Sequence, residues 1–188
     1  FIFRPKINSV HKSKDGTIKW LLEMDDKSLI ETVFIPQGKR GTICISSQVG
    51  CTLSCTFCNT GTQKLVRNLN AYEILGQIFT VIDHLNDWPM GKTNRKVTNL
   101  VMMGMGEPLL NYENVKKALK IVMSSNGLCI SKRRITMSTS GIVPMIEQCG
   151  KDLDVNLAIS LHAVDDKLRN KLVPVSYTHL TLPTMMSV

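Results

Sequence analysis

Three closely spaced cysteines are the residues of this sequence best suited to chemistry. Cys51, Cys55 and Cys58 follow the pattern C-x3-C-x2-C. The irons of a [4Fe–4S] cluster are usually held by cysteine thiolates, so three local thiolates would leave one iron without a protein ligand. An open iron can bind a small molecule and pass it an electron. The spacing therefore predicts a cluster that acts on a bound molecule, because a cluster that only carries electrons needs no such opening.

A zinc site and a disulfide framework are the competing interpretations. A structural zinc ion takes four ligands, commonly supplied as two close pairs. Cys55 and Cys58 could form one pair, but Cys129 and Cys149 stand alone and His162 has no close partner. Disulfide frameworks are typical of short secreted chains, whereas this sequence has 188 residues and no secretory pattern at its start. The cluster is favoured over both.

Composition predicts a globular domain with an anionic partner. Hydrophobic residues make up 43% of the chain and charged residues 20%, and no apolar run is long enough to span a membrane. We therefore expect no membrane partner and a reducing, cytoplasmic location. The net charge of +8 favours a polyanion such as nucleic acid. The densest basic run covers residues 132–134, while Lys116, Lys117 and Lys120 are interpreted as a solvated helix face.

Strand and helix patterns alternate along the chain. Residues 17–35 alternate apolar and polar residues on either side of a polar turn, which predicts a β-hairpin. Further strands are predicted at residues 42–49, 97–103, 134–138 and 155–161. Helices are predicted after them, at residues 71–85, 115–123, 143–149 and 166–172, and the first of these has apolar residues at the 3.6-residue period. About four βα units predict an α/β fold with a parallel sheet, too few for a closed eight-fold barrel and consistent with a partial, open one.

This pattern also divides the chain. We expect residues 1–41 to form an amino-terminal β-hairpin extension and residues 42–175 to form the core. Because the sequence begins at Phe1 and not at a methionine, we expect a fragment of a longer protein.

Polar or glycine-rich segments follow each predicted parallel strand. They are the cysteine loop and residues 104–108, 138–141 and 160–162. Chemistry in parallel α/β folds collects at the carboxyl ends of strands, so these segments predict one site. Gly104 and Gly106 would let the backbone approach a ligand closely, and Glu107 could accept hydrogen bonds from an ammonium group or ribose hydroxyls. Taken singly, Glu107 could also cap a helix.

Other polar residues have simpler interpretations when taken alone. Ser138 and Ser160 could each cap the helix that follows, and His162 could be a core histidine. Cys44 is interpreted as a buried strand cysteine and Glu31 as an exposed strand carboxylate. Cys129 and Cys149 are interpreted as small buried residues.

Longer motifs resemble the RlmN/Cfr family of RNA adenine methyltransferases, a branch of the radical S-adenosylmethionine (SAM) enzymes. The matching stretches are residues 31–36, 44–51, 67–69, 102–111, 131–134, 138–141, 157–163 and 172–174. The resemblance covers roughly residues 28–175. It implies an incomplete (βα)6 radical SAM barrel, a [4Fe–4S] cluster, SAM as cofactor, and an electron donor such as a flavodoxin system. It implies methylation of an adenine in 23S rRNA, at C2 in the branch that also modifies tRNA and at C8 in the Cfr branch. The sequence as a whole is more similar to the C2 branch, so methylation at C2 is favoured.

The resemblance also implies roles for individual residues. It makes Cys51, Cys55 and Cys58 the cluster ligands. Contacts to SAM are implied for Gly106, Glu107, Ser138, Ser160, Leu161 and His162. Cys44 matches the cysteine that resolves a covalent RNA adduct and ends in a disulfide, and Glu31 matches a proton acceptor.

Two features depart from the family pattern. Residues 176–188 have no counterpart in the family and are expected to be foreign to it, as at a read-through or assembly junction. The family carries its methyl group on a cysteine near the carboxyl terminus, and no cysteine of this sequence stands in that context. We therefore expect an incomplete catalytic core, inactive in RNA methylation by itself. A C8 methyltransferase and a non-catalytic iron–sulfur or zinc RNA-binding module remain the alternative functions.

Overall fold

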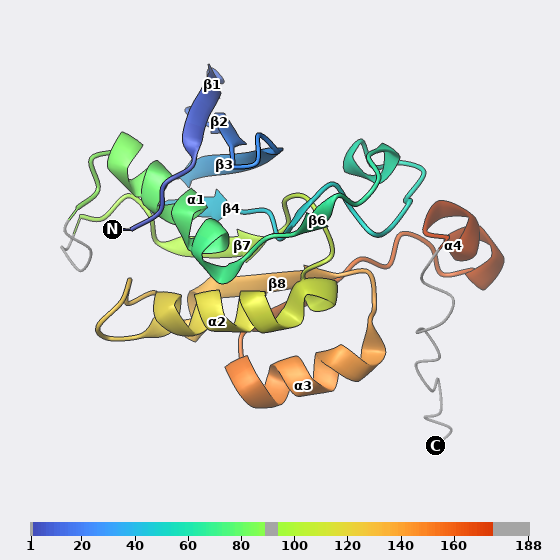
Figure 1. The fold of residues 1–188 in the computed structure, drawn as a ribbon. Helices are drawn as coiled ribbons and strands as arrows, with labels where there is room; N and C mark the ends of the chain where they lie inside the picture. The colour runs from blue at the N-terminus through green and yellow to red at the C-terminus, as the bar shows by residue number, and fades with distance from the viewer. Residues whose placement is uncertain (1, 89–93, 175–188) are drawn as a thin grey trace.

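The computed structural model describes residues 2–88 and 94–174, and the expected foreign tail at residues 176–188 lies outside them (Figure 1). Seven strands form one sheet in the order β1-β2-β3-β4-β7-β8-β9. Their bounds are β1 Lys6–Lys12, β2 Ile18–Glu23, β3 Leu29–Gln37, β4 Arg40–Cys44, β7 Asn99–Met102, β8 Ile135–Thr139 and β9 Asn156–Ile159. The first four strands pair antiparallel, and β4, β7, β8 and β9 pair parallel.

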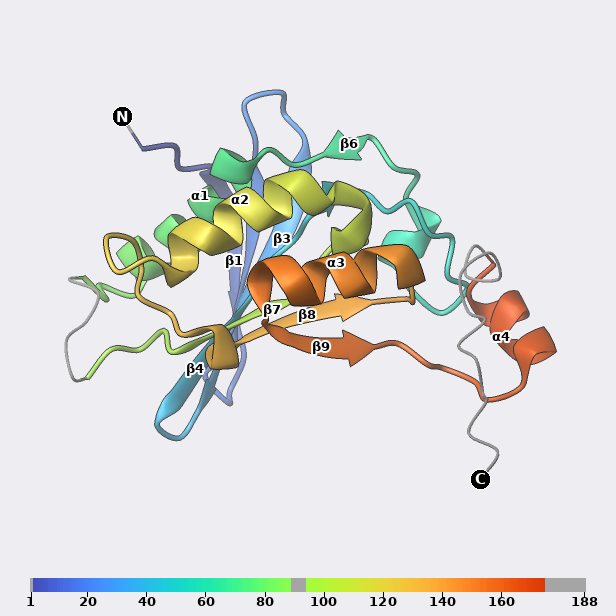
Figure 2. The same ribbon diagram turned by 90° about the horizontal axis from the view of Figure 1, so that it is seen from below.

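Each parallel strand is followed by a helix. These are α1 Ala71–His84, α2 Tyr112–Met123, α3 Val143–Leu153 and α4 Asp166–Leu172. Helices α2 and α3 lie side by side along the parallel strands, whereas α4 lies beyond the carboxyl ends of β8 and β9 (Figure 2). The four predicted βα units are therefore confirmed. Within the described ranges, no helix is long and apolar enough to cross a membrane.

The two faces of the sheet differ in burial. On one face Ile43, Leu100 and Ile135 are completely buried against the helices, as expected for alternate residues of a strand. On the other face, the aligned residues Cys44 and Val101 are only partly buried. This second face is the one that would look into the lumen of a complete barrel.

Three elements differ from the sequence-based prediction. The amino-terminal hairpin is confirmed as β2 and β3, but β1 adds a third strand to it. The strand expected at residues 42–49 is two strands, because the chain leaves the main sheet after Cys44. Residues Gln48–Val49 form the short strand β5, which pairs with β6, Arg67–Asn68, in a separate ribbon. Strands β1 to β4 run in one continuous sheet, and the division at residue 41 stays a prediction.

Candidate active site

The short ribbon of β5 and β6 closes the loop that carries the three cysteines. Gly50 begins this loop with φ +75°, and a Cβ there would lie 2.2 Å from the Lys64 carbonyl oxygen, so only glycine fits. At the other end, Arg67 donates two 2.8 Å hydrogen bonds to the Glu73 carboxylate and a 2.6 Å hydrogen bond to Asp26. Bidentate guanidinium–carboxylate pairs fix geometry as well as charge. The loop therefore projects from a rigid base.

The three cysteines open into one cavity of about 330 Å³ at the carboxyl ends of the parallel strands. Its other lining residues come from the loop, from three strand ends and from the residue after α4: Leu53, Phe57, Thr60, Met102, Met103, Gly104, Gly106, Glu107, Pro108, Ser138, Thr139, Ser140, Ser160, His162 and Val173. Eight of the eleven predicted site residues line it. Leu161, Glu31 and Cys44 do not.

Cys51 and Cys55 sit in an environment that disfavours bare thiolates. Burial raises the pKa of Cys51 and the charges of Cys58 and Glu107 raise it further, while burial and the other two loop cysteines raise the pKa of Cys55. A bound metal centre would reverse this effect, because its positive charge stabilises coordinating thiolates. In residues 2–88 and 94–174, no three His, Cys, Asp or Glu side chains are arranged around one metal-ion position.

The cavity itself fits a polar ligand beside the cysteines. Ser140 is one of its lining residues, and the buried Ser140 Oγ makes no hydrogen bond within the described parts of the chain. A buried polar atom without a partner is costly, and a bound ligand would supply one. Three thiols beside glycine backbone and hydroxyl groups are a donor set for a cluster with one open iron. Ser140 was not singled out from the sequence.

Glu107 connects two strand ends and faces the cavity. It is 3% exposed. Its Oε2 accepts a 2.8 Å hydrogen bond from the Ser140 amide and its Oε1 a 3.2 Å hydrogen bond from the Leu109 amide. Burial raises the pKa of Glu107, although these backbone donors oppose the shift. An ionised carboxylate offers about four acceptor positions, so the two backbone amides leave room for a ligand to donate to Glu107.

Gly106 brings the Glu107 loop against the base of the cysteine loop. Its φ is +93°, and a Cβ would lie 2.5 Å from Gln48 Cβ and 2.9 Å from the Gln48 amide nitrogen. The Gln48 side chain accepts a 3.0 Å hydrogen bond from the Glu107 amide and donates one of 2.7 Å to Asn68. Gln48 therefore joins the two loops, a role that only their folded arrangement reveals.

Gly106→Ala is expected to destabilise the protein by about 2–4 kcal/mol, because it combines backbone strain with a steric clash against main-chain atoms. Gly150→Ala is the matched control. Gly150 lies inside α3 with no atom within 4 Å of an added Cβ, so alanine there should stabilise by about 0.5–1 kcal/mol. Urea unfolding of both variants measures the difference. Equal stability of the two variants would contradict this account of the loop.

The ends of β8 and β9 place two hydroxyls together. Ser138 Oγ and Ser160 Oγ lie 3.4 Å apart. The His162 ring packs on Phe57 of the cysteine loop with centroids 4.3 Å apart, while Leu161 is 54% exposed. The structure therefore brings Ser138, Ser160 and His162 to the cavity and directs Leu161 away from it.

Arg169 of α4 holds these strand ends in place. Its guanidinium donates a 2.6 Å hydrogen bond to the Ser140 carbonyl, one of 3.2 Å to the Ser160 carbonyl and one of 3.0 Å to the Leu161 carbonyl. The side chain is 4% exposed. The same helix reaches the cysteine loop, since the Thr56 amide donates to the Leu172 carbonyl at 3.0 Å. Arg169 was not predicted from the sequence, because its sequence neighbours form no motif that indicates a role for it.

Glu31 and Cys44 lie on the open face of the sheet, outside the cavity. Glu31 accepts a 2.8 Å hydrogen bond from Lys19 Nζ and remains half exposed. Its carbonyl accepts a hydrogen bond from Ser46, just past the carboxyl end of β4. Burial raises the pKa of the Cys44 thiol. All six cysteines are free, so the expected disulfide has no support. Cys129 is exposed, and its assignment as a buried residue was wrong; Cys149 is buried as expected.

Comparison with known proteins agrees with this geometry. Residues 45–179 match the sequence pattern of the radical SAM superfamily. The chain is 58% identical to "Dual-specificity RNA methyltransferase RlmN" of Parvibaculum lavamentivorans, covering 93% of this chain and 46% of that protein. It is 55% identical to the protein of that name from Zymomonas mobilis subsp. mobilis, covering 93% of this chain and 45% of the relative. The chain thus spans about half the length of these curated relatives.

A solved structure is similar as well. The crystal structure of a radical SAM methyltransferase from Sphaerobacter thermophilus is 40% identical and superimposes with a TM-score of 0.86. The match covers 94% of this chain and 51% of that one. Since the superfamily pattern matches most of the sequence, and the fold and the cysteine loop agree with it, the chain belongs to the radical SAM superfamily.

Proposed function

We propose that this chain is the catalytic core of a radical SAM methyltransferase that methylates C2 of adenine in 23S rRNA and in tRNA. The observation that carries the proposal is the shared cavity, in which three cysteines of one loop face Glu107 and the strand-end serines. The names of the similar proteins, which are dual-specificity RNA methyltransferases, support the reaction and the substrate class. The net charge of +8 is compatible with an RNA partner.

The residues would divide the work as follows. Cys51, Cys55 and Cys58 would hold the cluster. When bound, a [4Fe–4S] cluster with an open iron supplies the electron that cleaves SAM to a 5′-deoxyadenosyl radical. Glu107, anchored by two backbone amides, would accept hydrogen bonds from the SAM ammonium group.

The remaining expected residues would complete the site. Ser138, Ser160 and His162 would border the bound SAM, and Leu161 would contribute through its backbone. Glu31 and Cys44, on the open face of the sheet, would act on the RNA base as proton acceptor and resolving cysteine. We also propose a flavodoxin-type electron donor and a cytoplasmic location, where rRNA and tRNA are found.

Anaerobic reconstitution with iron and sulfide tests the cofactor assignment. We expect a cluster spectrum that changes when SAM is added, followed by release of 5′-deoxyadenosine on reduction. Bound zinc, or a cluster whose spectrum does not change when SAM is added, would overturn the enzyme assignment in favour of a binding module. The substrate is tested with the complete gene product, methyl-labelled SAM and 23S rRNA: 2-methyladenine in the digest supports the proposal, and 8-methyladenine contradicts it.

Glu107→Gln is expected to weaken SAM binding at least about tenfold while leaving the cluster in place, because the amide loses acceptor capacity and charge. Calorimetric titration with SAM, at matched iron content, measures this effect. Glu147→Gln is the matched control, because Glu147 is an exposed helical residue paired only with Lys151 in the part of the chain that is described. Unchanged SAM affinity in Glu107→Gln would remove Glu107 from the site.

A further inference from the structure

A basic pocket lies at the end of the sheet opposite the cysteine loop. Its volume is about 600 Å³. It is lined by Phe34, Pro36, Gly38, Lys39, Arg40, Asn94, Arg95 and Lys96. Four of these eight residues are Lys or Arg, and none is acidic. Nothing in the proposed chemistry uses this pocket.

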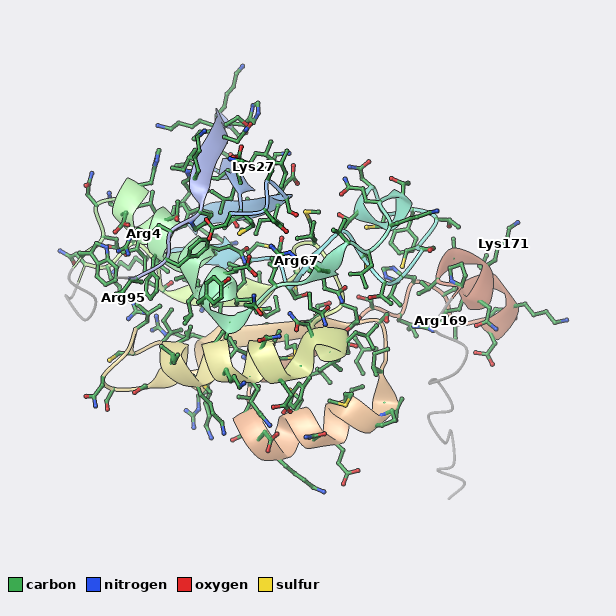
Figure 3. The ribbon with its side chains drawn as sticks, viewed as in Figure 1. Arg4, Lys27, Arg67, Arg95, Arg169 and Lys171 are labelled. Atoms are coloured by element: carbon green, nitrogen blue, oxygen red, sulfur yellow. The ribbon has the colours of Figure 1, made fainter. Side chains whose placement is uncertain are left out.

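The cations gather where parallel strands begin. Arg40 is the first residue of β4, Lys96 lies just before β7, and Arg134 directly precedes β8. These strands are neighbours in the sheet, so the three residues lie along the edge of the sheet at which its parallel strands begin. Figure 3 shows Arg95 at one end of the molecule and Arg169, near the candidate active site, at the other.

The Arg95 guanidinium has one nitrogen without an acceptor among the described residues. Its Nε atom is buried and makes no hydrogen bond in the described ranges. Burial and the charge of Arg134 lower the pKa of Arg95, while Asp87 opposes this. The Asp87 carboxylate, however, already accepts the amides of Lys96 and Val97 at 2.7 and 2.8 Å. Since a guanidinium stays protonated, an added anion would relieve both the missing hydrogen bond and the repulsion.

We propose that this pocket, together with Arg134 at the start of β8, binds the phosphate backbone of the RNA substrate. The inference rests on the proposed function for the identity of the partner. A row of cations across three neighbouring strands suits a repeating anion better than a single one. Lys132 is not included, because it pairs with Asp154.

The contacts should position RNA without reading its sequence. Phe34, the aromatic residue of the pocket, is 6% exposed, so it offers no ring face on which a base could stack. Charge contacts to phosphates fix register and orientation but carry no base information. The rim would therefore hold a part of the RNA distant from the reacting adenine.

The test is RNA binding by a triple variant, Lys39→Gln, Arg40→Gln and Arg95→Gln. The matched control, Lys12→Gln, Lys14→Gln and Lys117→Gln, removes the same charge from exposed lysines elsewhere on the surface. Fluorescence anisotropy with a labelled single-stranded RNA oligonucleotide, over a salt series, gives affinity and salt dependence. We expect the triple variant to bind at least about tenfold more weakly at low salt, with the slope of log K against log salt about 2 less steep. The control should lose much less.

Each other outcome overturns the proposal. No RNA binding by the parent chain, an unchanged triple variant, or equal losses in both variants would show that the rim is no specific docking surface. If poly-glutamate bound to the parent chain as tightly as RNA and with the same salt dependence, an acidic protein partner would be indicated instead. The single variant Lys39→Gln, at an exposed turn position, guards against misfolding of the triple variant and should reduce the slope by about 0.7.

This measurement separates the two proposals. It uses the protein without cluster or SAM, so failure of the cofactor assignment would leave it unchanged. Conversely, an unaltered RNA affinity in the triple variant would leave SAM cleavage and the cavity assignment intact.

Discussion

Cys55→Ala should abolish both cluster assembly and SAM cleavage. Cys55 lies in the middle of the loop, and its thiol interacts electrostatically with those of Cys51 and Cys58. With one thiolate gone, two irons would lack protein ligands, and a cluster so held should be lost on gel filtration. We expect the iron content after reconstitution to fall to background and 5′-deoxyadenosine to become undetectable.

The chain supplies a matched control for this experiment. Cys129 is also a free cysteine, but it is exposed and does not line the cavity. Cys129→Ala should therefore reconstitute and cleave SAM as the parent does. Iron content and Mössbauer or absorption spectra measure the difference directly, without depending on activity. Normal iron content in Cys55→Ala would remove this residue from the ligand set and with it the basis of the proposed function.

Much of the fold could be predicted because its signals are local. Buried strands and amphipathic helices each leave a period in the sequence, and helix α4 occupies Asp166–Leu172, as predicted. The location of the site followed from one topological rule, that parallel strands bring their carboxyl ends to the same rim. The cavity indeed collects residues from after β5, β7, β8 and β9.

The elements that were missed carry no such local signal. Strand β1, Lys6–Lys12, contains no buried residue, so its sequence has no apolar alternation to detect. Strands β5 and β6 are two residues long, too short for any period. The division of residues 42–49 depended on where the chain turns out of the sheet, which is decided by a partner strand some twenty residues later.

The supporting polar residues were missed for a related reason. Gln48 and Arg169 act through hydrogen bonds to residues far away in the sequence, such as Glu107 and Ser140. When only the neighbours in the sequence are known, such a polar residue cannot be told from an ordinary surface residue. Arg67 had one available signal, because it belongs to a stretch, residues 67–69, that carried the family resemblance.

Arg169→Ala is expected to destabilise the protein by about 2–4 kcal/mol, since it leaves the buried Ser140 carbonyl and the partly buried Ser160 carbonyl without this donor. Both residues line the candidate active site. Helix α4 should also loosen from the cysteine loop, where Leu172 accepts the Thr56 amide. We therefore expect weaker SAM binding in addition to the lower stability.

Two further variants separate the buried hydrogen bonds from the loss of a positive charge. Lys171→Ala removes a cation from the same helix, but Lys171 is exposed and points into solvent (Figure 3), so its unfolding free energy should change by less than about 0.5 kcal/mol. Arg169→Lys keeps the charge but lacks the planar fork that reaches several carbonyls, and it should recover only part of the loss. Urea unfolding gives the free energies of unfolding of the three variants, and SAM titration of each reconstituted variant gives the effect on the site.

The outcomes distinguish charge from hydrogen bonding. If Arg169→Lys were as stable as the parent and bound SAM equally well, charge alone would be sufficient and the carbonyl contacts would not hold the strand ends. If instead Arg169→Ala lowered stability and left SAM affinity unchanged, α4 would stabilise the fold without shaping the cavity. Only a joint loss, absent in Lys171→Ala, fits an arginine that holds the ends of β8 and β9 where a ligand binds.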